Sequence, residues 1–209
     1  MRTTLYLLRH AATEANLANP PRLQGRNHNP PLARLGVRQA EATRDFLAVR
    51  PIDVCYCSPL RRALQTARIV SLPHGIIPFP DQALTECDVG RWEGMAWQEI
   101  RYFDAGAYRD FMRDPGAHGY PGGENFQQVQ ARASTAIEDI LSRHENKSIL
   151  IVSHHVVNRI YLSSLLGLPL EQARQVSLDN CGISVVTRED GKTSVSMLNA
   201  AFHLQGVAA

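Results

Sequence analysis

The chain has 209 residues, of which 44% are hydrophobic and 20% are charged, and its formal net charge is only +2. This length and composition fit one globular domain with a sizeable core and exclude a disordered or fibrous chain. The nearly balanced charge gives no reason to expect a nucleic-acid partner, and the apolar run near the N-terminus is far too short for a signal peptide or a membrane span. We therefore expect a cytoplasmic protein with no nucleic-acid or membrane partner, whose four cysteines are reduced thiols.

The first predicted strand is the apolar run Leu5–Leu8, which ends in Arg9 and His10. Ligands of open α/β sheets bind at the carboxyl ends of the strands, so these two side chains are candidates for a functional site. A long loop rich in Pro, Asn and Gly follows at 20–31, and hydrophobic spacing predicts an amphipathic helix over 35–49.

A second short strand is predicted at 53–58, and a helix follows it at once. Ser58 is the expected N-cap, with Pro59 at the first helical position. Arg61 and Arg62 would then lie in the first turn, where cations oppose the helix dipole. Either the two are a solvated pair, or an anion binds at this helix N-terminus.

The third predicted strand, 76–79, leads into a loop that contains Glu86. The segment at about 95–123 is aromatic and irregular, and we expect short helices and a loop that lie over the edge of the sheet. Core packing is the expected role for most of these aromatic side chains, and a substrate lid is the alternative.

The remaining chain alternates in the same way. A long helix runs to about residue 144, and the apolar strand 148–153 ends in His154 and His155. A helix at 157–166 and two strands at 182–187 and 194–199, joined by a turn, complete the chain. The pattern predicts an α/β fold, a three-layer α/β/α sandwich with a mostly parallel sheet and an antiparallel edge strand. We expect residues 1–209 to form a single domain with the lid inserted at about 95–123.

Three predicted strand ends carry polar groups, namely Arg9-His10, Arg61-Arg62 and His154-His155. If these strands are parallel neighbours, their ends gather cations and imidazoles into a pocket that suits a phosphate dianion. Histidine can act there as nucleophile, acid or cation. Glu86 would supply a proton if its surroundings raise its pKa, and a surface salt bridge is the alternative. Adjacent residues of a strand face opposite ways, so His154 and His155 are poor ligands for one metal ion, and no metal is expected.

Several segments, in order from residue 5 to about residue 187, resemble the histidine phosphatase (phosphoglycerate mutase-like) superfamily. They are Leu7-Leu8-Arg9-His10 with Thr13 and Asn16, Gln24-Gly25, the run 58–67, Leu84-Thr85-Glu86 with the run 90–94, Pro121-Gly122-Gly123-Glu124, and Val152-Ser153-His154.

The resemblance implies a role for each matching residue. His10 matches the nucleophile that becomes a phosphohistidine, and Glu86 matches the proton donor that later activates water. The residues implied to bind the phosphate are Arg9, Arg62 and His154, with Asn16 as a further polar contact; Gln24, Gly25 and His155 are added as expected substrate contacts. No metal or cofactor is implied, because two arginines and a protonated His154 can balance a dianion.

Two positions depart from the family pattern, which usually has Gly after each of the two histidines. Ala11 is a small change that we expect to be tolerated. His155 is bulkier, and it would narrow the pocket, contact the phosphate or point into the core; we favour the core or the rim. Arg61 falls where the family varies, and the loop 26–31 does not follow the family, so no substrate contact is carried over to it.

The favoured function is a metal-independent phosphatase that hydrolyses a small phosphorylated metabolite. A cofactor-dependent phosphoglycerate mutase is the alternative enzyme, but mutases of that kind carry a longer insertion, and here His154 follows Glu86 by only 68 positions. The alternative outside catalysis is a phosphate-binding protein, which the complete set of His10, Arg62, Glu86 and His154 disfavours. The substrate is not predicted, and a homodimer stays open.

Overall fold

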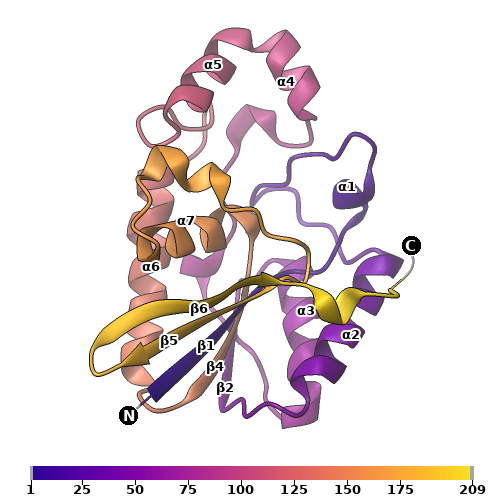
Figure 1. Cartoon of the computed structure of the whole chain (residues 1–209). Coiled ribbons are helices and arrows are strands. Elements are labelled where there is room, and N and C mark those ends of the chain that lie inside the picture. Colours follow the sequence, from indigo (N-terminus) through magenta and orange to yellow (C-terminus); the bar gives the residue numbers. More distant parts are fainter. Residues whose placement is uncertain (1, 208–209) are drawn as a thin grey trace.

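The computed structural model describes residues 2–207, which form one mixed sheet with helices on both faces (Figure 1). The strands are β1 (Arg2–Arg9), β2 (Val54–Cys57), β3 (Phe79–Pro80), β4 (Ser148–Ser153), β5 (Ile183–Glu189) and β6 (Lys192–Ala200). The helices are α1 (Glu14–Leu17), α2 (Arg34–Leu47), α3 (Arg61–Ser71), α4 (Trp97–Phe103), α5 (Ala105–Arg113), α6 (Phe126–Arg143) and α7 (His155–Leu165). Short 3₁₀ turns lie at Leu72–His74, Gln82–Leu84, Gly90–Trp92, Leu170–Gln175 and Phe202–Leu204.

The strand order is β3-β2-β4-β1-β5-β6. The first four strands are parallel, whereas β5 pairs antiparallel with β1, and β6 pairs antiparallel with β5. The predicted three-layer sandwich with a mostly parallel sheet is therefore confirmed, with two antiparallel strands at one edge. The central strands β2, β4 and β1 end at the same edge, as the sequence predicted.

Alternation along the central strands divides the core between two helical layers. Leu5 and Leu7 of β1, with Ile149 and Ile151 of β4, pack against α6 and α7. The intervening Leu150 and Val152 of β4, with their neighbours on β1 and β2, pack against α2 and α3 on the other face. Because successive side chains of a strand face opposite sides, an all-apolar run is what a sheet covered on both faces requires.

The segment from α4 to the start of α6 has an apolar cluster of its own. Trp92, Phe111 and Tyr120 make edge contacts there and are buried together with Phe126 at the start of α6. Figure 1 shows α4 and α5 set apart from the sheet, beyond the ends of the central strands. Most aromatic side chains of the segment pack as predicted, but Tyr102 and Phe103 on α4 are largely exposed.

Two local predictions were wrong. The third strand is restricted to Phe79 and Pro80, because prolines at 78 and 80 lack the N–H groups that a longer ladder needs. Helix α3 begins at Arg61 with Leu60 as its N-cap residue, not at Pro59. The side chain of Asn29, from the preceding loop, accepts the Arg61 backbone N–H at 2.7 Å and so satisfies one orphan donor of this helix.

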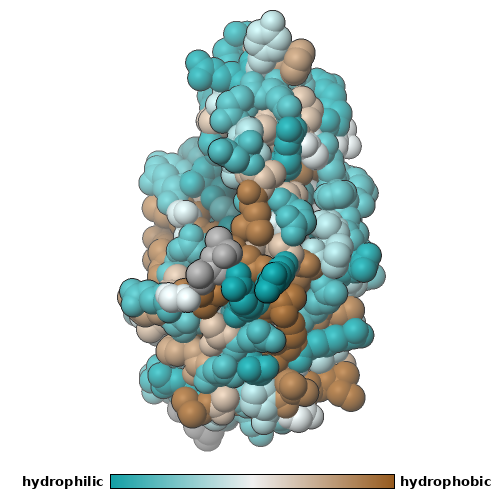
Figure 2. Space-filling model, turned by 90° about the vertical axis from the view of Figure 1, so that its right-hand side faces the viewer, coloured by the Kyte–Doolittle hydropathy of each residue, from teal (hydrophilic) through white to brown (hydrophobic). Residues whose placement is uncertain are grey.

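The face with α2, α3 and the C-terminal segment carries apolar side chains among polar ones (Figure 2). Phe46, Leu72 and Phe202 are exposed large hydrophobic side chains of these elements. Scattered apolar residues are normal on protein surfaces, so the homodimer stays a prediction. In the described part of the chain, no helix is both long and apolar enough to cross a membrane.

The α2 layer is in close contact with the segment after β1. A methyl group added to Gly36 of α2 would lie 2.0 Å from the carbonyl oxygen of Ala12, far inside van der Waals contact. We expect Gly36→Ala to lower the free energy of unfolding by about 1–3 kcal/mol, as overpacking does. Urea unfolding measures the change.

Gly106→Ala is the matched control, because no atom lies within 4 Å of the added methyl group on α5. It should leave stability unchanged or raise it by up to about 1 kcal/mol, since Ala favours a helix over Gly. Equal stabilities of the two variants would contradict the close packing of α2.

Candidate active site

The ends of β1 and β4 bring two histidines together. The backbone N–H of His10 donates to the carbonyl oxygen of Ser153 at 2.9 Å, which continues the parallel pairing beyond Arg9. His154 follows Ser153 as the N-cap residue of α7. The two imidazole rings lie with centroids 5.1 Å apart, and both side chains are buried. The predicted convergence of these two strand ends is confirmed.

His10 has one ring nitrogen fixed and the other available for chemistry. Nδ1 lies 2.8 Å from the carbonyl oxygen of Ala11, which can only accept, so Nδ1 carries the proton and donates it. Nε2 is then the unprotonated nitrogen with a free lone pair. Burial, followed by the charges of Arg62 and Arg9, holds the pKa of His10 well below its usual range. A neutral imidazole at neutral pH is the state that a nucleophile requires.

Ala11 fits the position where the family usually has Gly. It is fully buried, and its φ lies outside the left-handed region, so the residue needs no glycine-like backbone conformation. Its N–H donates to the Thr66 hydroxyl of α3 at 3.0 Å, while its carbonyl accepts from His10. The expectation that alanine is tolerated here agrees with this geometry.

Arg62 is fully buried in the first turn of α3 and is held by backbone carbonyls. Nη2 donates to the carbonyl oxygen of Gly25 at 2.8 Å, and Nη1 donates to that of His28 at 3.2 Å. The loop that supplies these oxygens is folded around Glu93, whose carboxylate accepts the N–H groups of Gly25 at 2.7 Å and His28 at 2.9 Å. Arg61, by contrast, is exposed.

Several donors of this cluster have no partner among the described residues. Arg9 donates to the carbonyl oxygen of Leu178 at 2.6 Å, but its buried Nε has none, and neither has Nε of Arg62. Both ring nitrogens of His154 are buried without a partner. Buried polar groups are nearly always hydrogen-bonded, so this group of donors indicates a site for an anion with several oxygens.

Burial lowers the pKa of the two arginines, that of Arg9 to about 10, yet both stay charged at neutral pH. Burial and the charge of Arg62 lower the pKa of His154 well below its usual range. His154 is therefore neutral in the free site, which differs from the protonated state implied by the family resemblance. A bound dianion raises the pKa of His154 and so favours its protonated form.

Glu86 is the buried carboxyl group of the site. Its Oε1 accepts the Cys87 N–H at 2.8 Å, and its Oε2 accepts the Val156 N–H of α7 at 3.3 Å. Burial raises the pKa of Glu86, although these N–H groups and Arg62 act in the opposite sense. The structure thus gives this carboxyl the raised pKa on which its expected role as a proton donor depends.

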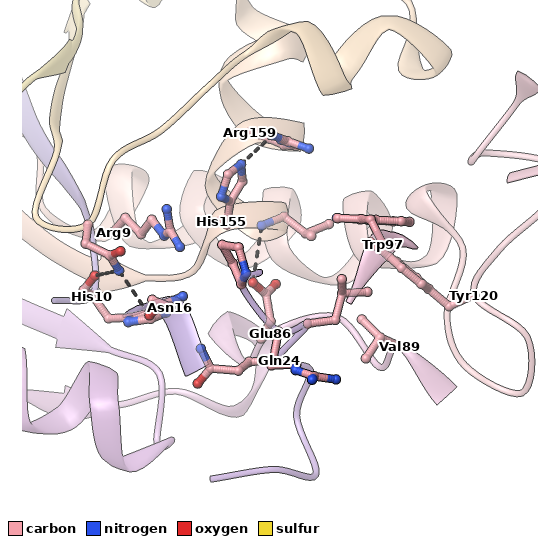
Figure 3. Close-up of a pocket in the computed structure, with 15 residues that line it drawn as sticks. Arg9, His10, Asn16, Gln24, Glu86, Val89, Trp97, Tyr120, His155 and Arg159 are labelled. Carbon is pink, nitrogen blue, oxygen red and sulfur yellow. Dashed lines mark hydrogen bonds between the residues drawn. The ribbon is translucent and has the colours of Figure 1, made fainter. Parts of the chain in front are cut away.

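A cavity of about 390 Å³ lies over this cluster (Figure 3). Of the predicted residues, Arg9, His10, Asn16, Gln24, Glu86 and His155 line the cavity, whereas Arg62, His154 and Gly25 do not. Arg62 and His154 are fully buried, and Gly25 acts through its backbone on Arg62. His155 lies at the cavity wall and not in the core.

Asn180 is a site residue that sequence reasoning missed. Its side chain donates to the carbonyl oxygen of His10 at 2.9 Å and to Oδ1 of Asn16 at 3.4 Å. Asn16 in turn accepts the N–H and the hydroxyl of Thr13, and that hydroxyl also lies 2.9 Å from Oε1 of Gln24. Tyr120 and Trp97, from the aromatic segment for which a substrate lid was the alternative role, also line the cavity, as do Arg22 and Arg159, which were not predicted. Only Arg159 had a signal, its position one helical turn after His155.

Among residues 2–207, no three His, Cys, Asp or Glu side chains are grouped so that they could hold a metal ion. The polar groups of the cavity instead match the oxygens of a small anion.

Arg132 of α6 fixes the segment that leads to Glu86. Its guanidinium donates to the carbonyl oxygens of Ala83, Thr85 and Glu86 and pairs with Glu124 at 2.8 Å. We expect Arg132→Gln to lower the free energy of unfolding by about 2–4 kcal/mol, because it leaves several acceptors and a half-buried carboxylate unpaired.

The matched control is Arg143→Gln on the same helix, where the ion pair with Asp139 is exposed. Arg143 also lies 5.7 Å from the centre of the Tyr56 ring, so we expect a loss of about 1 kcal/mol or less, the sum usual for an exposed ion pair and an exposed cation–π contact. Denaturant unfolding of both variants tests the difference, and similar losses would show that Arg132 does not fix this segment.

Comparison with known proteins agrees with this geometry. A model of the histidine phosphatase superfamily (branch 1) matches residues 5–201. Phosphoserine phosphatase 1 of Hydrogenobacter thermophilus is 30% identical over 200 residues, with 96% of this chain and 93% of the relative covered. Bacillus stearothermophilus YhfR has a similar structure, with a TM-score of 0.89, 32% identity, and 97% of this chain and 99% of that chain covered. A phosphoserine phosphatase mutant of Entamoeba histolytica, solved with phosphoserine, gives a TM-score of 0.85 at 26% identity, with 97% and 99% covered. The chain belongs to the histidine phosphatase superfamily, branch 1.

Proposed function

We propose that this protein is a phosphatase that hydrolyses a small phosphorylated metabolite in two steps, through a phosphohistidine and without a metal ion. One observation carries the proposal: Arg9, Arg62 and His154, which have unpartnered ring or guanidinium nitrogens, lie near a histidine with a free Nε2. A buried carboxyl group with a raised pKa, Glu86, completes the set. Free cysteine thiols agree with a cytoplasmic location.

In the first step, Nε2 of His10 attacks the phosphorus atom and the bond to the ester oxygen breaks. The arginines and His154 hold the other phosphoryl oxygens, whose negative charge opposes attack in water. Glu86, in its acid form, gives its proton to the departing alkoxide, so that a neutral alcohol leaves. The phosphoryl group is then bonded to His10, and Glu86 is a carboxylate.

In the second step, a water molecule attacks the phosphorus atom of the phosphohistidine. The Glu86 carboxylate takes a proton from this water, and the bond to His10 breaks as phosphate forms. Neutral His10 and protonated Glu86 are restored, so one carboxyl group serves both steps in opposite directions. No separate base is needed.

A phosphoglycerate mutase would use the same first step but must keep water away from the phosphoenzyme. The short segment between Glu86 and His154 favours hydrolysis, as do relatives that carry phosphatase names. A protein that only binds phosphate would not need the His10–Ala11 hydrogen bond, which leaves Nε2 unprotonated. Phosphatase activity is therefore the function that these observations favour.

We expect His10→Ala to lower kcat by roughly ten-thousand-fold or more, because the nucleophile is removed. Phosphate release from a panel of monoesters, measured with a metal chelator present, provides the assay. The control is His118→Ala, which changes an exposed histidine and should leave the rate unaltered. Hydrolysis by His10→Ala at the wild-type rate would refute the covalent mechanism, and isomerisation of 3-phosphoglycerate without phosphate release would favour the mutase.

We expect Glu86→Gln to slow hydrolysis of alkyl phosphates by about 10²–10⁴-fold and of p-nitrophenyl phosphate by much less, since p-nitrophenolate leaves without a proton. In the wild type, kcat for alkyl esters should fall as the pH rises through the raised pKa of Glu86, because the acid form is lost. This descent should be absent in Glu86→Gln and retained in the exposed control Glu145→Gln. A variant that keeps the descent would exclude Glu86 as the acid.

A further inference from the structure

A second cationic group lines the cavity beside the phosphate-binding cluster. Arg159 and His155 lie one turn apart on α7, and both face the cavity (Figure 3). Figure 3 shows the two side chains as a hydrogen-bonded pair, in which His155 lies between Arg9 and Arg159. Neither residue of this pair has a role in the proposed two-step mechanism.

The guanidinium of Arg159 is oriented by neutral acceptors. Its Nε donates to the carbonyl oxygen of Val176 at 3.2 Å, and its Nη2 donates to Nε2 of His155. The ion pairs of the described residues are formed by other arginines and by Lys147. A guanidinium has five N–H donors, so three of them remain for a ligand, and Glu86 is the acidic side chain whose charge acts on Arg159.

His155 supports this arrangement as a neutral group. Its Nε2 accepts from Arg159, which places the imidazole proton on Nδ1. Burial, and then the charges of Arg9 and Arg159, hold the pKa of His155 well below its usual range. The pair therefore carries a single positive charge, and both of its members can donate hydrogen bonds.

The rest of the described cavity wall offers Arg159 no carboxylate in a direct ion pair. Glu86 is the only carboxylate among the described lining residues, and it belongs to the phosphate end. Arg22, the other cation of the wall outside that end, pairs with Glu99 at 2.5 Å. Trp97 and Tyr120 add neutral aromatic surface. A substrate whose only charge is its phosphate would leave Arg159 without an anionic partner on the ligand.

We propose that Arg159, oriented by His155 and the Val176 carbonyl, is a specificity-determining residue that binds a carboxylate on the alcohol part of the substrate. The preferred substrates are then phosphate monoesters of small hydroxy acids or of hydroxy amino acids. One guanidinium fork matches one monoanionic carboxylate in geometry and charge, whereas the phosphate dianion already has Arg9 and Arg62. A cavity of about 390 Å³ is at the small end of ligand sites and suits a molecule of this size.

The inference rests on the proposed phosphatase function, and a matched pair of substrates tests it. O-phosphoethanolamine is O-phosphoserine without the carboxylate, so the ratio of their kcat/KM values reports recognition of that group alone. We expect wild type to prefer O-phosphoserine, and Arg159→Met to reduce the ratio by about 10–100-fold, the range of a charged hydrogen bond. Arg159→Lys should retain part of the preference because the charge remains, and His155→Gly should lower it by loosening Arg159.

Arg174→Met is the control, because this nearby arginine lies over the Phe111 ring and does not line the cavity. It should leave the ratio of the two kcat/KM values unchanged. Thermal unfolding of each variant checks that the variant is folded. Equal turnover of both esters by wild type, or the same ratio in folded Arg159→Met or Arg159→Lys, would overturn the inference while the phosphatase function stands. Faster turnover of an alkyl bisphosphate than of O-phosphoserine would also overturn it. Failure to hydrolyse any monoester would instead contradict the proposed function.

Discussion

The central physical constraint on this protein is that positive charge must be buried without being neutralised. Arg62 is fully buried and Arg9 is partly buried, and burying a charge is costly unless it is paired. A carboxylate partner would reduce that cost but would compete with an anionic ligand for the same N–H groups. The protein uses backbone carbonyls of Gly25, His28 and Leu178 instead. These oxygens orient the guanidiniums and leave their charge available to the phosphate.

Acidic side chains lie outside the cavity and hold the segments that position its residues. Glu93 folds the loop whose carbonyls hold Arg62, and Glu124 pairs with Arg132, which fixes the segment before Glu86. Glu86 is the exception, because the proposed mechanism requires a carboxyl group beside the ester oxygen. Burial there raises the pKa of Glu86, so the environment that makes a carboxylate costly also makes it a useful acid. The placement of acidic side chains thus accounts both for the loop structure around Glu93 and for the raised pKa of Glu86.

The fold and the centre of the site could be predicted because their signals are local in sequence. The apolar runs that end in Arg9-His10 and in His154 can be recognised as strands from the sequence alone, and the parallel pairing of these strands then brings their ends together. Strand β3 is shorter than predicted, although the prolines that limit it are visible in the sequence. The start of α3 was missed because Asn29, which lies far away in the chain, accepts the first backbone N–H of this helix.

The remaining site residues depend on contacts between segments far apart in the chain. Asn180 reaches the carbonyl of His10 from 170 positions away, and Arg132 reaches the Glu86 segment across 46 positions. Nothing in the local pattern around such residues separates them from ordinary surface polar groups. His155 shows the same limit, because its role at the cavity wall becomes visible only once His155 and the Val176 carbonyl are seen to accept hydrogen bonds from the same guanidinium, that of Arg159.

The account depends most directly on a covalent bond between phosphorus and His10. An alkaline quench during turnover, followed by mass spectrometry of peptides, detects a phosphoramidate because this bond is labile in acid and stable in base. The account predicts one phosphoryl group on the peptide that contains His10, formed before phosphate appears and absent without substrate. Turnover without any such adduct, or an adduct on another residue, would contradict it.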